Sequence, residues 1–241
     1  MHGVHLLETI RSLPTGVPAA AFLRHAERFP ILDSADPTLA EITPAGAAAA
    51  ETFGAQIRGF ECVRIFHSPV KRCRQTAECI ARGVASTGSQ VEIVGAEDAL
   101  GVDYIMDLTE AGRLTVLHGN HFVRLWFSGQ VAPTVIRAAE QIAARKLAFL
   151  TQRLDELSPH GRRLDLHVSH DWNILVLREL VCGVRHEEAG WLNFLDGVTF
   201  WSTPAGLSAI YRDRTVTNPP PWPFISPPIR PPAGNGLSLA P

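Results

Sequence analysis

Short runs of strand length alternate along the chain with longer segments of helical pattern. The expected strands cover about residues 19–23, 63–67, 90–94 and 164–170. The expected helices cover about residues 43–58, 68–82, 133–157 and 173–181. Strands that alternate with helices predict a mainly parallel sheet with helices on both faces. We therefore expect an α/β fold, a three-layer α/β/α sandwich.

The last two apolar segments predict an antiparallel edge on this sheet. Residues 198–202 and 207–211 flank Thr203-Pro-Ala-Gly206, which has the composition of a turn. Two short strands separated by such a turn are typical of a β-hairpin.

Two of the expected helices begin with a hydroxyl residue followed by proline. These pairs are Thr43-Pro44 and Ser68-Pro69. A serine or threonine oxygen can accept a hydrogen bond from the first helical turn, and proline fits the first helical position. Thr43 and Ser68 are therefore the predicted N-caps.

The pattern favours one domain with an insertion and a tail. Residues 1–217 form the expected domain. Within it, the apolar residues of segment 97–130 follow no regular spacing, and we interpret this segment as an inserted cap of short helices. Residues 218–241 are rich in proline and resemble polyproline. We interpret them as a packed or disordered tail, with an SH3- or WW-type ligand as the alternative.

The charge of the chain excludes some classes of partner, and its cysteines predict the state of the thiols. The chain has 22 basic and 24 acidic residues, a net charge of −2, so it has no global basic field for nucleic acid or an anionic membrane. The four cysteines form no CxxC pair and are expected to be buried or half-buried, reduced thiols. The N-terminus lacks the pattern of a signal peptide, and no apolar run reaches the roughly 18 residues of a membrane-spanning helix. A cytoplasmic protein is expected.

Charged side chains and imidazoles follow three of the predicted strands. The carboxyl ends of parallel strands lie at one edge of a sheet, so these residues are expected to meet there. Guanidinium groups form forked hydrogen bonds to phosphate oxygens, and several of them around one histidine predict a phosphate site. The candidates are Arg24, His25, Arg28, Arg72, His170 and Asp171.

Three motifs at these positions resemble the histidine phosphatase (phosphoglycerate mutase-like) superfamily. The first, Arg24-His-Ala-Glu-Arg-Phe-Pro30, is similar to the Arg-His-Gly signature, with the second arginine and the proline of the acid phosphatase branch. Ser68-Pro-Val-Lys-Arg72 with Gln75-Thr-Ala77 is similar to the segment that supplies the third phosphate-binding arginine of the mutase-like branch. Val168-Ser-His-Asp171 resembles the His-Asp motif of the acid phosphatase branch, so the branch stays open. Ala26 stands where the family usually has glycine.

The resemblance implies a mechanism. His25 would attack phosphorus and become a phosphohistidine. Asp171 would be the general acid and then the base, with a carboxylate near the cap as the alternative donor. No cofactor or metal is required. The groups expected to hold the phosphate oxygens are Arg24, Arg28, Arg72 and His170. The alternative donors are Glu97, Asp103 and Asp107.

The expected activity is hydrolysis of a small phosphomonoester that resembles a sugar phosphate. The expected partner is then a small molecule, and neither nucleic acid nor a membrane is expected as a partner. The assembly that we consider for the chain is a homodimer. The alternatives are a mutase that returns phosphate to its substrate, a phosphate-binding module without turnover, and a metal site. Two histidine pairs have the spacing of metal ligands. The first pair falls on a predicted strand, where residues three apart face opposite sides and do not easily share one ion. These pairs are His167 with His170 and His118 with His121.

Overall fold

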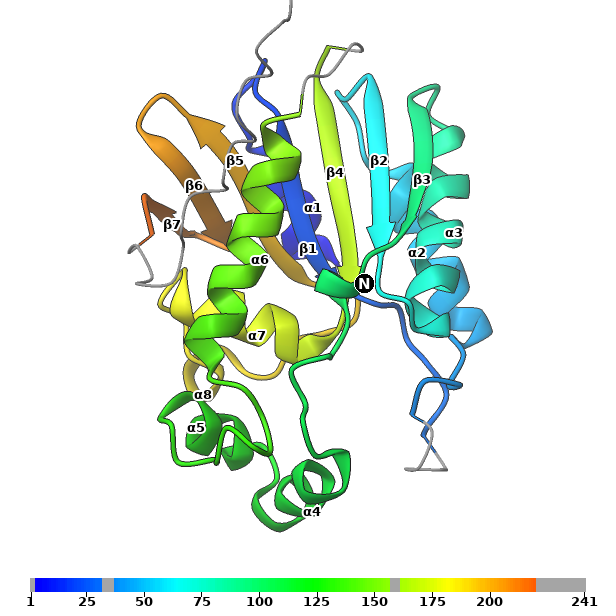
Figure 1. The fold of residues 1–241 in the computed structure, drawn as a ribbon. Helices are drawn as coiled ribbons and strands as arrows, with labels where there is room; N and C mark the ends of the chain where they lie inside the picture. The colour runs from blue at the N-terminus through cyan, green and yellow to red at the C-terminus, as the bar shows by residue number, and fades with distance from the viewer. Residues whose placement is uncertain (1–2, 32–36, 157–160, 220–241) are drawn as a thin grey trace, which may run out of the picture.

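A seven-stranded sheet forms the centre of the molecule (Figure 1). The computed structural model describes residues 3–31, 37–156 and 161–219. The strands lie in the order β3-β2-β4-β1-β5-β6-β7. Their bounds are β1 Ala19–Arg24, β2 Cys62–His67, β3 Gln90–Ala96, β4 Arg163–Ser169, β5 Gly197–Thr203, β6 Gly206–Tyr211 and β7 Arg214–Thr217.

The first four strands of the chain run parallel, and the last three form an antiparallel edge. β4 pairs in parallel with both β1 and β2, and β2 pairs in parallel with β3. β5 pairs antiparallel with β1 and continues through the hairpin to β6 and β7. The expected α/β fold with a parallel sheet and an antiparallel edge is confirmed, although β7 was not predicted.

Helices cover both faces of the sheet (Figure 1). One face carries α1, α2 and α3, and the other carries α6 and α7. The buried side chains of β1 divide accordingly, because successive residues of a strand point to opposite faces. The helix bounds are α1 Val4–Arg11, α2 Pro44–Ala55, α3 Lys71–Ala85, η1 Asp98–Leu100, α4 Leu108–His118, α5 His121–Phe127, α6 Ala139–Leu154, α7 Asp171–Leu180 and α8 His186–Ala189.

The two predicted N-caps have different outcomes. Thr43 caps α2, since its hydroxyl accepts a hydrogen bond from the Gly46 amide at 2.9 Å. The prediction for Ser68 was wrong. α3 begins at Lys71 with Val70 at the N-cap position and no side-chain cap, because the Ser68 hydroxyl lies against the imidazole of His170 instead.

The helix expected from residue 133 begins six residues later, at Ala139. Residues 131–138 are held by backbone hydrogen bonds to the segment that precedes α4. The Met106 amide donates to Val135 at 2.9 Å, and the Arg137 amide donates to Tyr104 at 3.0 Å. These bonds pair backbone N–H and C=O groups without a helix, so the helix begins only after this segment.

The segment 97–130 contains η1, α4 and α5, and its two α-helices lie below the lower edge of the sheet in Figure 1. Arg124 of α5 forms ion pairs with Glu179 of α7 and Glu187 of α8, which join this segment to the rest of the fold. The division into a domain, a cap and a tail stays a prediction. Residues 220–241 of the expected tail lie outside the described residues.

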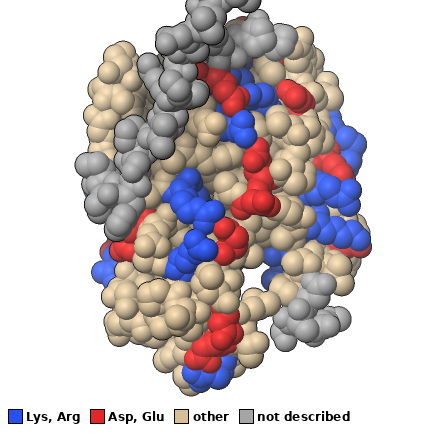
Figure 2. Space-filling view, viewed as in Figure 1, with Lys and Arg blue, Asp and Glu red and all other residues tan. Residues whose placement is uncertain are grey.

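All four cysteines are free and buried, as predicted. On the face shown in Figure 2, basic and acidic side chains are interspersed. Among the described residues, the helices are all too short or too polar to cross a bilayer.

α2 and α3 pack closely because glycines lie at their contact. A Cβ atom on Gly83 of α3 would overlap the backbone oxygen of Glu51 in α2. We expect Gly83→Ala to lower the free energy of unfolding by about 1–3 kcal/mol, because neither backbone can move without disturbing the packing. Urea denaturation measures this change.

Gly112→Ala is the matched control, because Gly112 also lies inside a helix but has open space around its Cβ position. It should raise the free energy of unfolding by about 0.5–1 kcal/mol through helix propensity. Equal effects of the two substitutions would contradict the role of Gly83 in packing.

His167 lies in the core of the sheet, stacked between Phe22 and Phe66 with ring centroids 4.7 and 5.1 Å away. Burial lowers its pKa to about 3, and the charges of Arg64 and Arg153 act in the same direction. The unfolded chain therefore binds a proton below about pH 6.5 that the folded chain does not bind, and stability falls as the pH falls toward 3.

We expect His167→Phe to reduce the loss of stability between about pH 6 and pH 4 by up to about 1.4 kcal/mol per pH unit. The measurement is the free energy of unfolding in urea at a series of pH values. His5→Ala, which removes a solvent-exposed imidazole, should leave the slope as in the wild type. An unchanged slope in His167→Phe would show that His167 does not contribute to acid destabilisation.

Candidate functional site

The parallel strands deliver two histidines to one edge of the sheet. β1 and β4 are neighbours, and His25 and His170 each follow the last residue of one of these strands. The His25 amide donates to the Ser169 carbonyl at 3.0 Å. The ring centroids of the two histidines lie 5.8 Å apart. Sheet order therefore joins residues separated by more than half of the chain.

Arg72 bridges the two imidazoles. Its Nε donates to Nε2 of His25 at 3.1 Å, and its Nη2 lies 3.1 Å from Nδ1 of His170. Its Nη1 donates to the carbonyl oxygen of Pro37 at 2.7 Å. Arg72 is the second residue of α3, which follows β2, so a third strand end supplies it. One guanidinium thus faces two ring nitrogens that both act as acceptors.

His25 is held as a neutral ring with a free electron pair at Nε2. Its Nδ1 lies 2.7 Å from the carbonyl oxygen of Ala26, which can only accept, so Nδ1 carries the proton. Nε2 then accepts from Arg72. Burial lowers the pKa of His25 to about 3, and the charges of Arg72 and Arg24 act in the same direction. His25 has the protonation state of a nucleophile at neutral pH.

His170 is neutral as well and has a second set of partners. Burial lowers its pKa well below the ordinary value, and the charges of Arg72, Lys146 and Arg24 act in the same direction. Its Nε2 lies 2.9 Å from the Ser68 hydroxyl and 3.8 Å from the Cys73 thiol. His170 is also the N-cap residue of α7, so Asp171 begins that helix and does not cap it.

Arg24 pairs with Asp171 beside the histidines. Its Nη2 lies 3.0 Å from Oδ2 of Asp171, and its guanidinium lies 4.3 Å from the ring centroid of Phe194. The same carboxylate oxygen accepts from the indole of Trp191 at 3.2 Å. A negative charge therefore balances part of the arginine charge at this edge.

Arg28 lies at the rim of the group. It is half-buried, and its Nη1 donates to the carbonyl oxygen of Phe29 at 2.9 Å. Burial lowers the pKa values of Arg24 and Arg72, and the charge of Arg28 acts in the same direction on both. The structure brings all six candidates to one edge of the sheet. Among the described contacts, Arg28 acts on Arg24 and Arg72 through its charge and does not touch a histidine ring.

The alternative proton donors are engaged elsewhere. Glu97 pairs with Arg153 at 2.6 Å, and Asp103 pairs with Arg145 at 2.9 Å. Asp107 caps α4 by accepting from the Glu110 amide at 2.9 Å. Asp171 is the carboxylate among these four that contacts a guanidinium of the site.

The aromatic, arginine and histidine side chains between residues 97 and 130 form three sets. Tyr104 and Trp126 are buried and stack with centroids 5.7 Å apart, so they pack this segment internally. Arg113 and Arg124 form ion pairs with glutamates. His118 and His121 lie at the facing ends of α4 and α5.

The histidine pairs with metal-like spacing do not form clusters of ligands. His167 lies in the core of the sheet, whereas His170 faces Arg72. Among the described residues, one group of three side chains brings ligand-type atoms together, namely Glu179, His186 and Glu187. The guanidinium of Arg124 already pairs with both of these glutamates.

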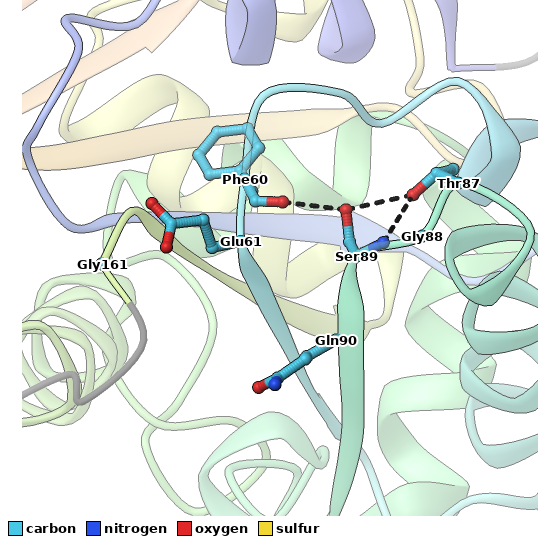
Figure 3. A pocket seen from close by; sticks show the side chains of 7 residues that line it. All are labelled: Phe60, Glu61, Thr87, Gly88, Ser89, Gln90 and Gly161. Atoms are coloured by element: carbon cyan, nitrogen blue, oxygen red, sulfur yellow. Dashed lines mark hydrogen bonds between the residues drawn. The ribbon is translucent and has the colours of Figure 1, made fainter.

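A shallow hollow lies at the opposite edge of the sheet (Figure 3). It is lined by residues around the starts of β2 and β3, including Phe60, Glu61 and Gln90. Thr87 and Ser89 at its border bond to each other and to backbone. The six candidate residues therefore lie at the other end of the strands from this hollow.

The sequence reasoning missed three contributors to the site. Ser68 was interpreted as a helix cap, although its place directly after a predicted strand was the same signal that identified His25. Phe194 and the Pro37 carbonyl enter through loops, and residues on loops carry no periodic pattern that predicts where they point.

The comparisons agree with this fold. Residues 21–98 match the family model described as histidine phosphatase superfamily (branch 1), a range that includes Arg24, His25, Arg28 and Arg72. No curated protein matches the sequence. Solved structures share the fold at low sequence identity.

Three of these structures illustrate the likeness. Bacillus stearothermophilus YhfR has a TM-score of 0.58 and 14% identity, over 79% of this chain and 94% of its own. Mycobacterial glucosyl-3-phosphoglycerate phosphatase has a TM-score of 0.54 and 14% identity, over 80% and 98%. A phosphoserine phosphatase from Entamoeba histolytica has a TM-score of 0.52 and 16% identity, over 81% and 97%.

The family model covers residues 21–98 of the chain, and the solved structures share its fold. The resemblance to the histidine phosphatase superfamily that the motifs predicted is confirmed, with branch 1 as the part of the family that matches residues 21–98.

Proposed function

We propose that the protein hydrolyses a small phosphomonoester through a phosphohistidine intermediate. The observation that carries this proposal is the contact of one buried guanidinium with Nε2 of His25 and Nδ1 of His170. A tetrahedral anion placed against that edge would touch both rings and Arg72. The substrate would be a phosphorylated metabolite that resembles a sugar phosphate.

His25 would be the nucleophile. Its Nδ1 proton is held by the Ala26 carbonyl, which leaves the Nε2 electron pair directed toward Arg72 and any phosphate bound there. Attack forms the Nε2–P bond and breaks the bond between phosphorus and the leaving oxygen. Water then attacks phosphorus, releases phosphate and restores the neutral ring.

Arg24, Arg28, Arg72 and His170 would hold the non-bridging oxygens. Catalysis of phosphoryl transfer depends mainly on positioning and on stabilisation of charge. Arg24 and Arg72 are largely buried, where their charges are screened less than in water. A phosphate dianion would supply the negative charge that Asp171 alone does not provide.

Asp171 would move the proton. In the structure its carboxylate pairs with Arg24. A bound phosphate would compete for this guanidinium and release the carboxylate to protonate the leaving oxygen, and afterwards to take a proton from water. The engagement of Glu97, Asp103 and Asp107 in other contacts supports this assignment.

The names of two structural neighbours support a small substrate. One acts on glucosyl-3-phosphoglycerate and the other on phosphoserine. Both substrates are phosphomonoesters of small metabolites, which is the class that we propose here. No step of the proposed mechanism uses a metal ion, so activity should survive EDTA.

A screen of phosphorylated metabolites with wild type and His25→Ala tests the proposal. We expect phosphate release by wild type and a loss of at least about 10³-fold in the variant, because His25 is the ring that presents a free Nε2 at this edge among the described residues. His5→Ala should keep the wild-type rate, since His5 lies on α1 and pairs with Glu8 on the surface.

Two other outcomes would favour the alternatives. A phosphorylated isomer of the substrate, without free phosphate, would indicate a mutase. Phosphate binding with no turnover of any monoester would indicate a binding module. Retention of phosphate release by His25→Ala would refute the proposed nucleophile.

Asp171→Asn tests the proton donor. We expect it to slow hydrolysis of alkyl monoesters by about 10²–10⁴-fold and to leave activated aryl phosphates nearly unaffected, because a good leaving group needs no proton. The measurement is kcat/KM for both substrate classes. Asp103→Asn is the control and should change neither rate much, since Asp103 pairs with Arg145 on the surface. Equal losses on both classes in Asp171→Asn would assign the donor to another residue.

A further inference from the structure

Ser68 contacts the second histidine of the site on the side away from the bridging arginine. Its hydroxyl lies 2.9 Å from Nε2 of His170, while Nη2 of Arg72 lies 3.1 Å from Nδ1 of the same ring. Ser68 has no solvent exposure, and His170 is 4% exposed. Both ring nitrogens therefore depend on protein partners.

These contacts fix the position of the proton on the His170 ring. A guanidinium can only donate, so Nδ1 must accept from Arg72. A neutral imidazole carries one proton, which then lies on Nε2 and is donated to the Ser68 oxygen. The remaining contact of Nε2, with the Cys73 sulfur at 3.8 Å, is longer and weaker.

A bound phosphate would reverse this requirement. The non-bridging oxygens of a phosphate dianion accept hydrogen bonds, and Arg72 would turn its donors toward them. Nδ1 of His170 would then face an acceptor in place of a donor, so the favourable proton position would be Nδ1. Nε2 would lose its proton and need a donor, and a serine hydroxyl can donate as well as accept.

We propose that Ser68 is a positioning residue that allows His170 to change tautomer when phosphate binds, a role that rests on the proposed function. The Nε2–H bond breaks and its proton passes to the solvent, and the Nδ1–H bond forms with a proton taken from the solvent. The ring carries one proton, and no charge, before and after the change. The Ser68 hydroxyl rotates from acceptor to donor and keeps Nε2 paired in both states.

The surroundings of His170 favour a neutral ring over an imidazolium. Two buried arginines, Arg72 and Arg24, and Lys146 of α6 contribute positive charge around it, and the ring itself is buried. A second proton on His170 would add to this charge. Moving one proton between the two nitrogens leaves the charge of the site unchanged.

Nitrogen NMR of protein labelled with ¹⁵N-histidine tests the inference, because protonated and unprotonated ring nitrogens have different shifts. We expect the His170 ring of the phosphate-free protein to carry its proton on Nε2, and saturating inorganic phosphate to move it to Nδ1. The His170→Asn variant assigns the signals. The His25 ring should keep its proton on Nδ1 without phosphate.

The outcomes separate the two proposals. If phosphate binds, as phosphorus NMR would show, and His170 keeps its proton on Nε2 or becomes doubly protonated, the tautomer change is refuted while the phosphatase proposal stands. If phosphate does not bind at all, both proposals fail.

Variants of Ser68 add a kinetic readout. Ser68→Ala should lower kcat/KM by about 2- to 10-fold through loss of one hydrogen bond that orients His170. Ser68→Thr keeps the hydroxyl and should restore most of the rate. Ser128→Ala, which removes a hydroxyl bonded only to backbone and Gln130 on the surface, is the control and should match wild type. A wild-type rate in a folded Ser68→Ala protein would refute the positioning role.

Discussion

The site depends on one guanidinium held between two neutral imidazoles. Arg72 donates to Nε2 of His25 and to Nδ1 of His170, which requires that both nitrogens lack a proton. Burial and the neighbouring positive charges satisfy this requirement by lowering both histidine pKa values. An imidazolium at either position would place two cations in contact away from water, where their repulsion is large.

A backbone carbonyl sets the direction of one ring, and a side-chain hydroxyl sets the direction of the other. The Ala26 carbonyl holds the Nδ1 proton of His25, and Ser68 occupies the far side of His170. The two rings consequently differ in tautomer, with the electron pair of each directed at the same arginine. In the proposed function this difference would suit one histidine to attack phosphorus and the other to hold an oxygen.

Sheet order brings these groups together. β4 lies between β1 and β2, so the residues after three strands from distant parts of the chain meet at one edge. Arg72 belongs to α3, and the close approach of α3 to α2 depends on glycines at the contact. α2 carries none of the six candidates, and it contributes to the geometry of the site through its packing against α3.

The sequence by itself determined six of the seven strands, the α/β fold and the residue types of the candidate site. Apolar runs and Thr43-Pro44 are local signals, and the local hydrogen bonds and burial that they require are present in the fold. The contact of Ser68 with His170, the late start of α6 and the pairing of Asp171 with Arg24 were decided only by the tertiary structure. Each of these depends on a partner more than 25 residues away, and a hydrogen bond to such a partner competes with the local one that the sequence pattern predicts.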